Sequence, residues 1–204
     1  MLTTRRLTLR PMTPADLPDL ASMLQDPVGM AAYEGPFSDD EVRGWLDRQV
    51  ETYQQYGYGL WAMVLTETEQ VIGQCGITRQ LISHEPQPEL GYHVKRDHWH
   101  HGYATEAALA CRDYAFSVLN FEEVFAQTRD TNIASMNVAI RVGMTVRSRF
   151  LKTYRGAEMP HFAFSVGQSD LRIAAMRDHL ADTEALNGPT DEAAVDAIAS
   201  WLAA

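Results

Sequence analysis

A short stretch between positions 89 and 108 combines residue types that can bind an anion and move a proton. A strand-like segment with Glu89 and His93 comes first, then a histidine-rich loop, then Gly102 and a helical pattern. Gly102 has no Cβ, so the backbone there can curl tightly and approach a ligand. The first amides of a helix lack partners within it, and together with the helix dipole they attract phosphates. The stretch therefore predicts a seat for a diphosphate.

The elements on either side of this loop follow from the spacing of apolar residues. Residues 89–94 alternate, with Glu89, Gly91 and His93 on one face and apolar side chains on the other, which is typical of a short strand. After Gly102, helical spacing falls on Ala104, Ala107, Ala108, Cys111, Ala115 and Val118. One face of that helix is therefore expected to be buried.

The loop between them carries a family resemblance. W-H-H-G-Y-A-T-E-A, residues 99–107, resembles the acyl-CoA loop of the GNAT N-acetyltransferase superfamily, usually written Q/R-x-x-G-x-G/A. Trp99 and the Y-A-T-E-A run are similar to the ribosomal-protein N-acetyltransferase branch, where a glycine commonly stands at the place of His100. The resemblance implies that acetyl-CoA is bound by Tyr92, His93, Val94, Trp99, His100, His101, Gly102, Tyr103, Ala104, Thr105 and Asn132.

A second segment supports the same family. N-I-A-S at residues 132–135, followed by V-G-M at residues 142–144, resembles the superfamily's N-x-A-S…G-F pattern, with methionine in place of phenylalanine. From the residues alone, Asn132 is a good helix N-cap and Ser135 falls at the third helical position, so a capping motif explains both. The resemblance implies more: Asn132 would contact the pantetheine arm, and Ser135 would lie near the CoA sulfur.

One departure from the family concerns the leaving group. Many members carry a tyrosine as general acid one helical turn after Ser135, where this chain has Ala139. The CoA thiol should have a pKa of about 8.5, so its departure as thiolate at pH 7 costs only ~2 kcal/mol. A weak donor such as the Ser135 hydroxyl can offset much of that cost. Ser135 is therefore predicted as a catalytic residue.

The acceptor amine must be neutral before it attacks. A lysine-like amine has a pKa of about 10.4 and an α-amine about 7.7–8.0, so a base helps the first more. In the superfamily a glutamate on this strand commonly acts as the base, often through water, which implies Glu89. His93 lies on the same face and is the competing base. The main-chain amides of residues 92–94 are expected to bind the thioester oxygen, with Gly91 permitting a bulge.

Composition limits the class of protein. The chain has 204 residues, 46% of them hydrophobic and 22% charged, which suits one globular domain with an appendage. A net charge of −10 argues against nucleic acid as a partner and suits a cationic amine. No apolar run approaches a membrane span, and no signal-peptide core opens the chain. Its two unpatterned cysteines are expected to be reduced, in a cytoplasmic protein.

The expected fold is α/β: a mixed, bent central sheet of about seven strands with helices on both faces, as the resemblance implies. The acyl-CoA would lie between two diverging strands. Residues 1–167 form the GNAT-like domain, and residues 79–88, with two prolines, are predicted as a surface loop. Residues 168–204 are predicted as an acidic helical extension that packs on the domain or forms a homodimer contact, because its last helix has an apolar face.

The acceptor and the reaction leave alternatives open. In the superfamily the region between the first two strands lines the acceptor site, so the resemblance implies Tyr33 and Glu34 as candidates for the acceptor pocket, with an ordinary loop as the alternative. A non-catalytic acyl-CoA sensor on the same fold is the runner-up, with Ala139 as its best support. A third possibility is a metal-dependent hydrolase that uses the histidines His93, His98, His100 and His101. Neither H-E-x-x-H nor a cysteine pair accompanies them, so no metal is expected.

Overall fold

The computed structural model describes residues 1–33, 35–82, 85–154 and 156–175. The chain divides into two compact units, Met1–Val166 and Gly167–Ala204. Residues 168–175 of the second unit are helical. The predicted helix over residues 191–202, and most of the one over residues 171–186, fall outside the described residues. The assignment of residues 168–204 as an extension with its own role therefore stays a prediction.

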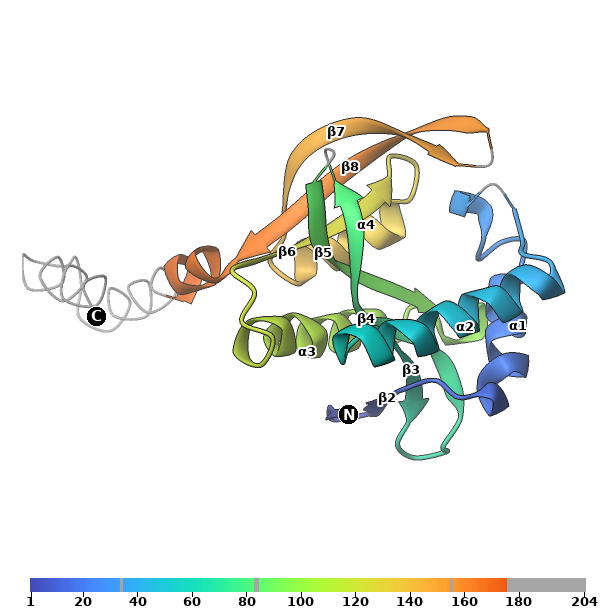
Figure 1. The fold of residues 1–204 in the computed structure, drawn as a ribbon. Coiled ribbons are helices and arrows are strands. Elements are labelled where there is room, and N and C mark those ends of the chain that lie inside the picture. The colour runs from blue at the N-terminus through green and yellow to red at the C-terminus, as the bar shows by residue number, and fades with distance from the viewer. Residues whose placement is uncertain (34, 83–84, 155, 176–204) are drawn as a thin grey trace, which may run out of the picture. The chain divides into compact units, whose positions relative to one another are not determined.

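One sheet organises the first unit (Figure 1). Its strand order is β1-β2-β3-β4-β5-β6-β8-β7, and neighbours from β1 to β5 pair antiparallel, as do β7 and β8. The strands are β1 Leu2–Thr3, β2 Leu7–Arg10, β3 Leu60–Leu65, β4 Val71–Ile82, β5 Glu85–Val94, β6 Glu123–Arg129, β7 Thr145–Tyr154 and β8 Ala157–Gly167. This mixed sheet confirms the predicted fold class. It adds one short strand, β1, to the expected set.

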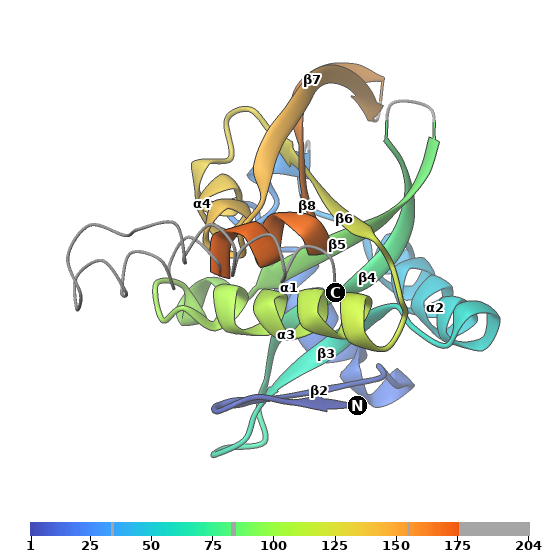
Figure 2. The ribbon, with the colours of Figure 1, turned by 90° about the vertical axis from the view of Figure 1, so that its left-hand side faces the viewer.

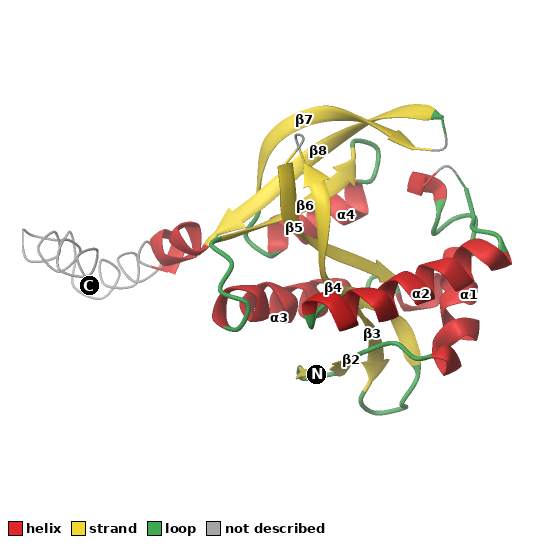
Figure 3. Ribbon diagram, viewed as in Figure 1, coloured by secondary structure: helices red, strands yellow, loops and turns green. Residues whose placement is uncertain are grey.

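Helices cover both faces, as predicted. Figure 2 shows α2 and α3 on opposite sides of the central strands, and Figure 3 shows the same arrangement by element type. The helices are α1 Leu17–Leu24, α2 Asp39–Tyr56, α3 Tyr103–Ser117 and α4 Ile133–Arg141, with short 3₁₀ turns η1 Pro14–Asp16, η2 Ala31–Tyr33 and η3 Arg96–His98. No helix among the described residues is long and apolar enough to cross a membrane.

The face of α3 predicted to be buried is buried at four of its six residues, while Ala104 is partly buried and Val118, just past the end of the helix, is 57% exposed. Ala107, Ala108, Cys111 and Ala115 have no exposed surface. The small side chains let α3 lie close to β4 and β5. The loop of residues 95–102 joins β5 to α3. Because α3 packs on β4 and β5, both ends of this loop are held in place.

The prediction of a loop over residues 79–88 was wrong. β4 and β5 continue through it as a paired hairpin, with Arg79 opposite Pro88 and Leu81 opposite Pro86. Proline cannot donate to a ladder, so it is confined to strand positions whose N–H would face no partner. Pro86 and Pro88 are two residues apart, which puts both missing N–H groups on the same side. β5 pairs with β6 at Glu89, which comes after both prolines. The edge of β5 that faces β6 therefore needs no N–H donors at Pro86 and Pro88.

β5 and β6 then form the joint on which the site depends. Both strands lie wholly in the described part of the chain, and they are parallel, with Glu89 opposite Phe125 as their register pair. Pairing of β5 with β4 continues without a register shift through Gly91 to Val94. The bulge expected at Gly91 is therefore absent from that pairing. β5 stays paired with β4 up to Val94 but separates from β6 beyond Glu89. The sheet is therefore open between β5 and β6 from that point.

Candidate functional site

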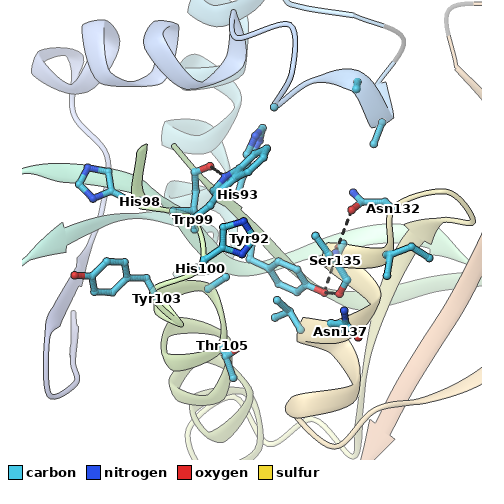
Figure 4. A pocket seen from close by; sticks show the side chains of 18 of the residues that line it. Tyr92, His93, His98, Trp99, His100, Tyr103, Thr105, Asn132, Ser135 and Asn137 are labelled. Carbon is cyan, nitrogen blue, oxygen red and sulfur yellow. Dashed lines mark hydrogen bonds between the residues drawn. The ribbon is translucent and has the colours of Figure 1, made fainter. Parts of the chain in front are cut away.

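A cavity of about 1010 Å³ lies where β5 has left β6, beside the start of α3 and the length of α4 (Figure 4). Most predicted site residues line it: Tyr92, His93, Val94, Trp99, His100, Gly102, Tyr103, Ala104, Thr105, Asn132 and Ser135. Two predicted residues, Glu89 and His101, do not. Ligand pockets typically occupy about 300–1,000 Å³, so this one has room for a large cofactor.

The glycine turn has the backbone that its sequence predicts. Gly102 has φ +79° and is followed directly by the first residue of α3. A Cβ on Gly102 would have its nearest neighbour at 3.6 Å, the Arg6 Nη2, so the space over the turn is open. His100 has φ +64°, a left-handed conformation that glycine adopts more easily. The amides opening α3 thus face a space in which an anion can sit.

Side chains of the loop itself and of the first residue of α3 hold this turn. The Trp99 indole donates to the Val94 carbonyl at 2.8 Å. The His101 Nδ1 lies 2.7 Å from the Trp99 carbonyl oxygen, and its ring stacks on Tyr103 with centroids 5.7 Å apart. His101 is exposed and is not among the residues that line the cavity, so its contacts shape the loop. Its predicted contact with the cofactor is not seen in the cavity lining.

Glu106, in the first turn of α3, ties that helix to the connection between β1 and β2. Its carboxylate accepts from the Thr4 hydroxyl at 2.6 Å, from the Arg6 amide at 2.8 Å and from the Arg6 Nε at 2.7 Å. These three donors lower the pKa of Glu106, against the opposite effect of its burial. The start of α3 is therefore held by Glu106 on the helix side of the loop, and the loop itself is held to β5 by Trp99.

A pair of hydroxyls meets at the start of α4. Asn132 caps the helix, because its Oδ1 accepts from the Ser135 amide at 3.1 Å. The Tyr92 hydroxyl donates to the Ser135 carbonyl at 2.8 Å, and the Ser135 hydroxyl donates to the Tyr92 oxygen at 3.3 Å (Figure 4). Sequence reasoning assigned Tyr92 only a main-chain role. Strand alternation was the available signal, since it places Tyr92 on the face opposite Glu89.

Burial controls what this pair can do. It raises the pKa of Tyr92, so the phenol stays protonated at neutral pH. Ala139, one helical turn after Ser135, is completely buried on α4. Tyr92 on β5 and Ser135 on α4 therefore each contribute a hydroxyl group to this end of the cavity.

His93 lines a different part of the cavity, together with Tyr33. Its ring stacks on Tyr33 with centroids 6.0 Å apart and planes at 9°. Gly29 lies close, because a Cβ there would be 3.5 Å from the His93 Nε2. Burial lowers the pKa of His93 to about 4, and the nearby Asp26 carboxylate only partly opposes this. The imidazole is therefore neutral at pH 7, and a pKa this low makes it a weak proton acceptor. Glu34, the other predicted acceptor residue, lies outside the described residues.

This burial predicts an acid-sensitive stability. Between the ordinary histidine pKa and about 4, the unfolded chain holds a proton on His93 that the folded chain does not. The free energy of unfolding should therefore fall as the pH falls through this window, by up to about 1.4 kcal/mol per pH unit. In His93→Gln the fall should be shallower, measured by urea unfolding at stepwise lower pH. An unchanged slope would mean that the imidazole is solvated.

Glu89 sits at the joint between the two strands, outside the cavity lining. Its Oε1 accepts from the Gln127 amide at 3.3 Å, and its Oε2 from the Thr78 hydroxyl at 3.5 Å. Both hydrogen bonds are long, so the carboxylate is loosely held. Burial raises the pKa of Glu89, while Lys152 and then the Gln127 amide lower it. A carboxylate of raised pKa beside the opening suits a base that reaches the cavity through water.

The histidines do not gather around a common centre. Within the described ranges, no three side chains of the His, Cys, Asp and Glu types lie close enough together to hold a metal ion. His93 stacks on Tyr33, His101 stacks on Tyr103, and His98 lies tilted over the same Tyr103 ring. These three imidazoles thus pack on aromatic rings, His93 on Tyr33 and the other two on Tyr103.

Comparisons with known proteins agree on one family. Residues 6–145 match the model of the acetyltransferase (GNAT) domain. The chain is 36% identical over 160 residues to an uncharacterized protein of Bacillus subtilis (strain 168), YkkB, covering 78% of this chain and 91% of that protein. It is 30% identical over 139 residues to the uncharacterized N-acetyltransferase p20 of Bacillus licheniformis, covering 67% and 78% of the two chains.

A solved structure gives the same result. The acetyltransferase from Agrobacterium tumefaciens str. C58 superimposes with a TM-score of 0.70 at 32% sequence identity, covering 82% of this chain and 94% of that one. The matched family region contains β2 through α4, and so every element that lines the cavity. The amino-acid patterns at residues 99–107 and 132–135 thus fall inside the shared domain.

Proposed function

Because the chain belongs to the acetyltransferase (GNAT) family, we propose that it transfers the acetyl group of acetyl-CoA directly to a primary amine, with both bound at once. The acceptor would be a protein N-terminus or a small-molecule amine. One observation carries the proposal: a single cavity joins the open turn at Gly102 to the hydroxyls of Tyr92 and Ser135 and to His93. Assignment to the ribosomal-protein branch and a cytoplasmic location stay predictions.

Acetyl-CoA fits this cavity by its chemistry. Its diphosphate would lie on the amides that open α3, where Gly102 leaves the turn free of a side chain. The pantetheine arm would run between β5 and α4, past Asn132. The thioester then reaches the Tyr92–Ser135 pair, and the acceptor amine enters along the wall formed by Tyr33 and His93.

The transfer itself requires little covalent help. The amine nitrogen forms a bond to the thioester carbon, the carbon–sulfur bond breaks, and its electron pair stays on sulfur. In the structure the Tyr92 hydroxyl donates to the Ser135 carbonyl and the Ser135 hydroxyl donates to the Tyr92 oxygen. Each hydroxyl would turn from that acceptor to donate a hydrogen bond to the thiolate. The raised pKa of Tyr92 makes it a hydrogen-bond donor that keeps its proton. The proton that the amine loses would pass to Glu89 through water, with His93 as the alternative acceptor.

Removing either hydroxyl tests this step. Ser135→Ala and Tyr92→Phe should each lower kcat by roughly tenfold with little change in the KM for acetyl-CoA, because one hydrogen bond to a good leaving group contributes ~1–1.5 kcal/mol. Since the two hydroxyls touch, their effects should not add in the double variant. Tyr56→Phe, an exposed phenol on α2, is the matched control. Unchanged kcat in both variants would reduce the pair to a structural contact.

The buried Ala139 supports one other reading, a non-catalytic acyl-CoA sensor. The two readings differ in CoA release. An enzyme should release CoA from acetyl-CoA in the presence of a broad panel of amines, including amino acids, polyamines, aminoglycosides and amino-terminal peptides. A sensor should bind acetyl-CoA and release no CoA with any of them.

A further inference from the structure

The cavity has an uneven distribution of charge. Of the described residues that line it, Arg141 is the one with a permanently charged side chain. Burial lowers the pKa of His93 and of His98, so neither adds a positive charge at neutral pH. Arg141 is the last residue of α4 and follows Asn137 by one helical turn, so both lie on the face that borders the cavity.

Arg141 also has no partner among the residues that the structure describes. Other arginines of this acidic protein are paired: Arg10 with Asp16 at 2.7 Å, Arg112 with Asp113 at 2.6 Å and Arg149 with Asp130 at 3.0 Å. For Arg141 no hydrogen bond or ion pair exists within the described part of the chain, and its side chain is exposed. The chain has a net charge of −10 and so many carboxylates, yet within the described ranges none forms an ion pair with this guanidinium.

Acetyl-CoA, the substrate of the proposed function, carries two separate phosphate charges. The diphosphate is matched by the amides and dipole at the start of α3. The 3′-phosphate of the ribose is a second anion that those amides cannot also bind. A guanidinium is planar, always charged and suited to hold a phosphate with two parallel hydrogen bonds.

We propose that Arg141 binds the 3′-phosphate of acetyl-CoA and makes the protein select CoA over its 3′-dephosphorylated form. The proposal rests on acetyl-CoA being the ligand of the cavity. It assigns the end of α4 a recognition role distinct from the chemistry at its start, where Ser135 lies.

The test compares two ligands and two variants. Acetyl-CoA and 3′-dephospho-acetyl-CoA are titrated by calorimetry into the full chain, into Arg141→Gln and into Arg43→Gln. Arg43 is an exposed arginine on α2 away from the cavity, so it controls for the loss of one positive charge. Wild type and Arg43→Gln should bind acetyl-CoA about tenfold more tightly than the dephospho form, as one charge-assisted contact near the surface implies.

In Arg141→Gln this preference should vanish, through about tenfold weaker binding of acetyl-CoA and unchanged binding of the dephospho form. Arg141→Lys should keep part of the preference, because a charge remains without the fork. Equal weakening of both ligands would place Arg141 at the diphosphate and overturn the proposal, as would a preference that survives Arg141→Gln. If wild type binds neither ligand, the proposed function itself fails, which is a separate result.

Discussion

Replacing Glu89 with glutamine is expected to lower kcat at pH 7 by roughly 10²–10⁴-fold, the usual loss when a positioned general base is removed. Glutamine keeps the shape of the side chain and can still accept from the Gln127 amide, as the carboxylate does at 3.3 Å. What it cannot do is take a proton. The carboxylate lies at the joint where β5 leaves β6, so a proton would reach it from the cavity through water.

The pH dependence of this loss identifies the role. The deficit of Glu89→Gln should shrink as the pH rises toward the pKa of the acceptor amine, since solution then supplies the neutral amine. Glu85→Gln removes an exposed carboxylate from the same strand and should leave kcat unchanged. A deficit that does not vary with pH would indicate structural damage. If Glu89→Gln is active and His93→Gln is not, the base is His93.

Gly102→Glu is expected to abolish the stabilisation of the protein by acetyl-CoA. At about 100 times its dissociation constant, a ligand raises the free energy of unfolding by about 2.7 kcal/mol. In the variant a side chain and a negative charge would occupy the open space over the turn, where the diphosphate is proposed to bind. Thermal unfolding with and without acetyl-CoA measures the difference.

Backbone strain needs its own control, because glutamate at φ +79° is unfavourable wherever it occurs. Gly57 closes α2 with φ +74°, and a Cβ there would meet nothing within 4 Å. Gly57→Glu should therefore lose similar intrinsic stability and keep the full acetyl-CoA shift. A Gly102→Glu protein that still gained thermal stability from acetyl-CoA would show that the diphosphate binds elsewhere.

The parts of the molecule that local chemistry decides were predictable from sequence. The Ser38 capping box, with the Glu41 amide 3.3 Å from the Ser38 hydroxyl, and the left-handed Gly102 depend on neighbouring residues alone. The same is true of Asn132 capping α4. Each of these positions is specified within a few residues of the chain, so no knowledge of the tertiary structure was needed.

The features that the sequence did not predict depend on contacts between residues far apart in the chain. Tyr92 and Ser135 are 43 residues apart, and only the packing of α4 on β5 brings their hydroxyls together. Pro86 and Pro88 fit a strand only because β5 is not yet paired with β6 at that point. The displacement of Glu89 from the cavity lining has the same origin, since it depends on where the two strands part.

The proposed function requires that an acetyl group passes from acetyl-CoA to an amine in this cavity. The most direct measurement incubates the full chain with acetyl-CoA labelled in its acetyl group and the amine panel, then identifies products by mass spectrometry. We predict label on the nitrogen of at least one amine, in equal amount to the CoA released, and loss of both in Gly102→Glu. Binding of acetyl-CoA with no labelled amine, or label recovered only as free acetate, would contradict the claim.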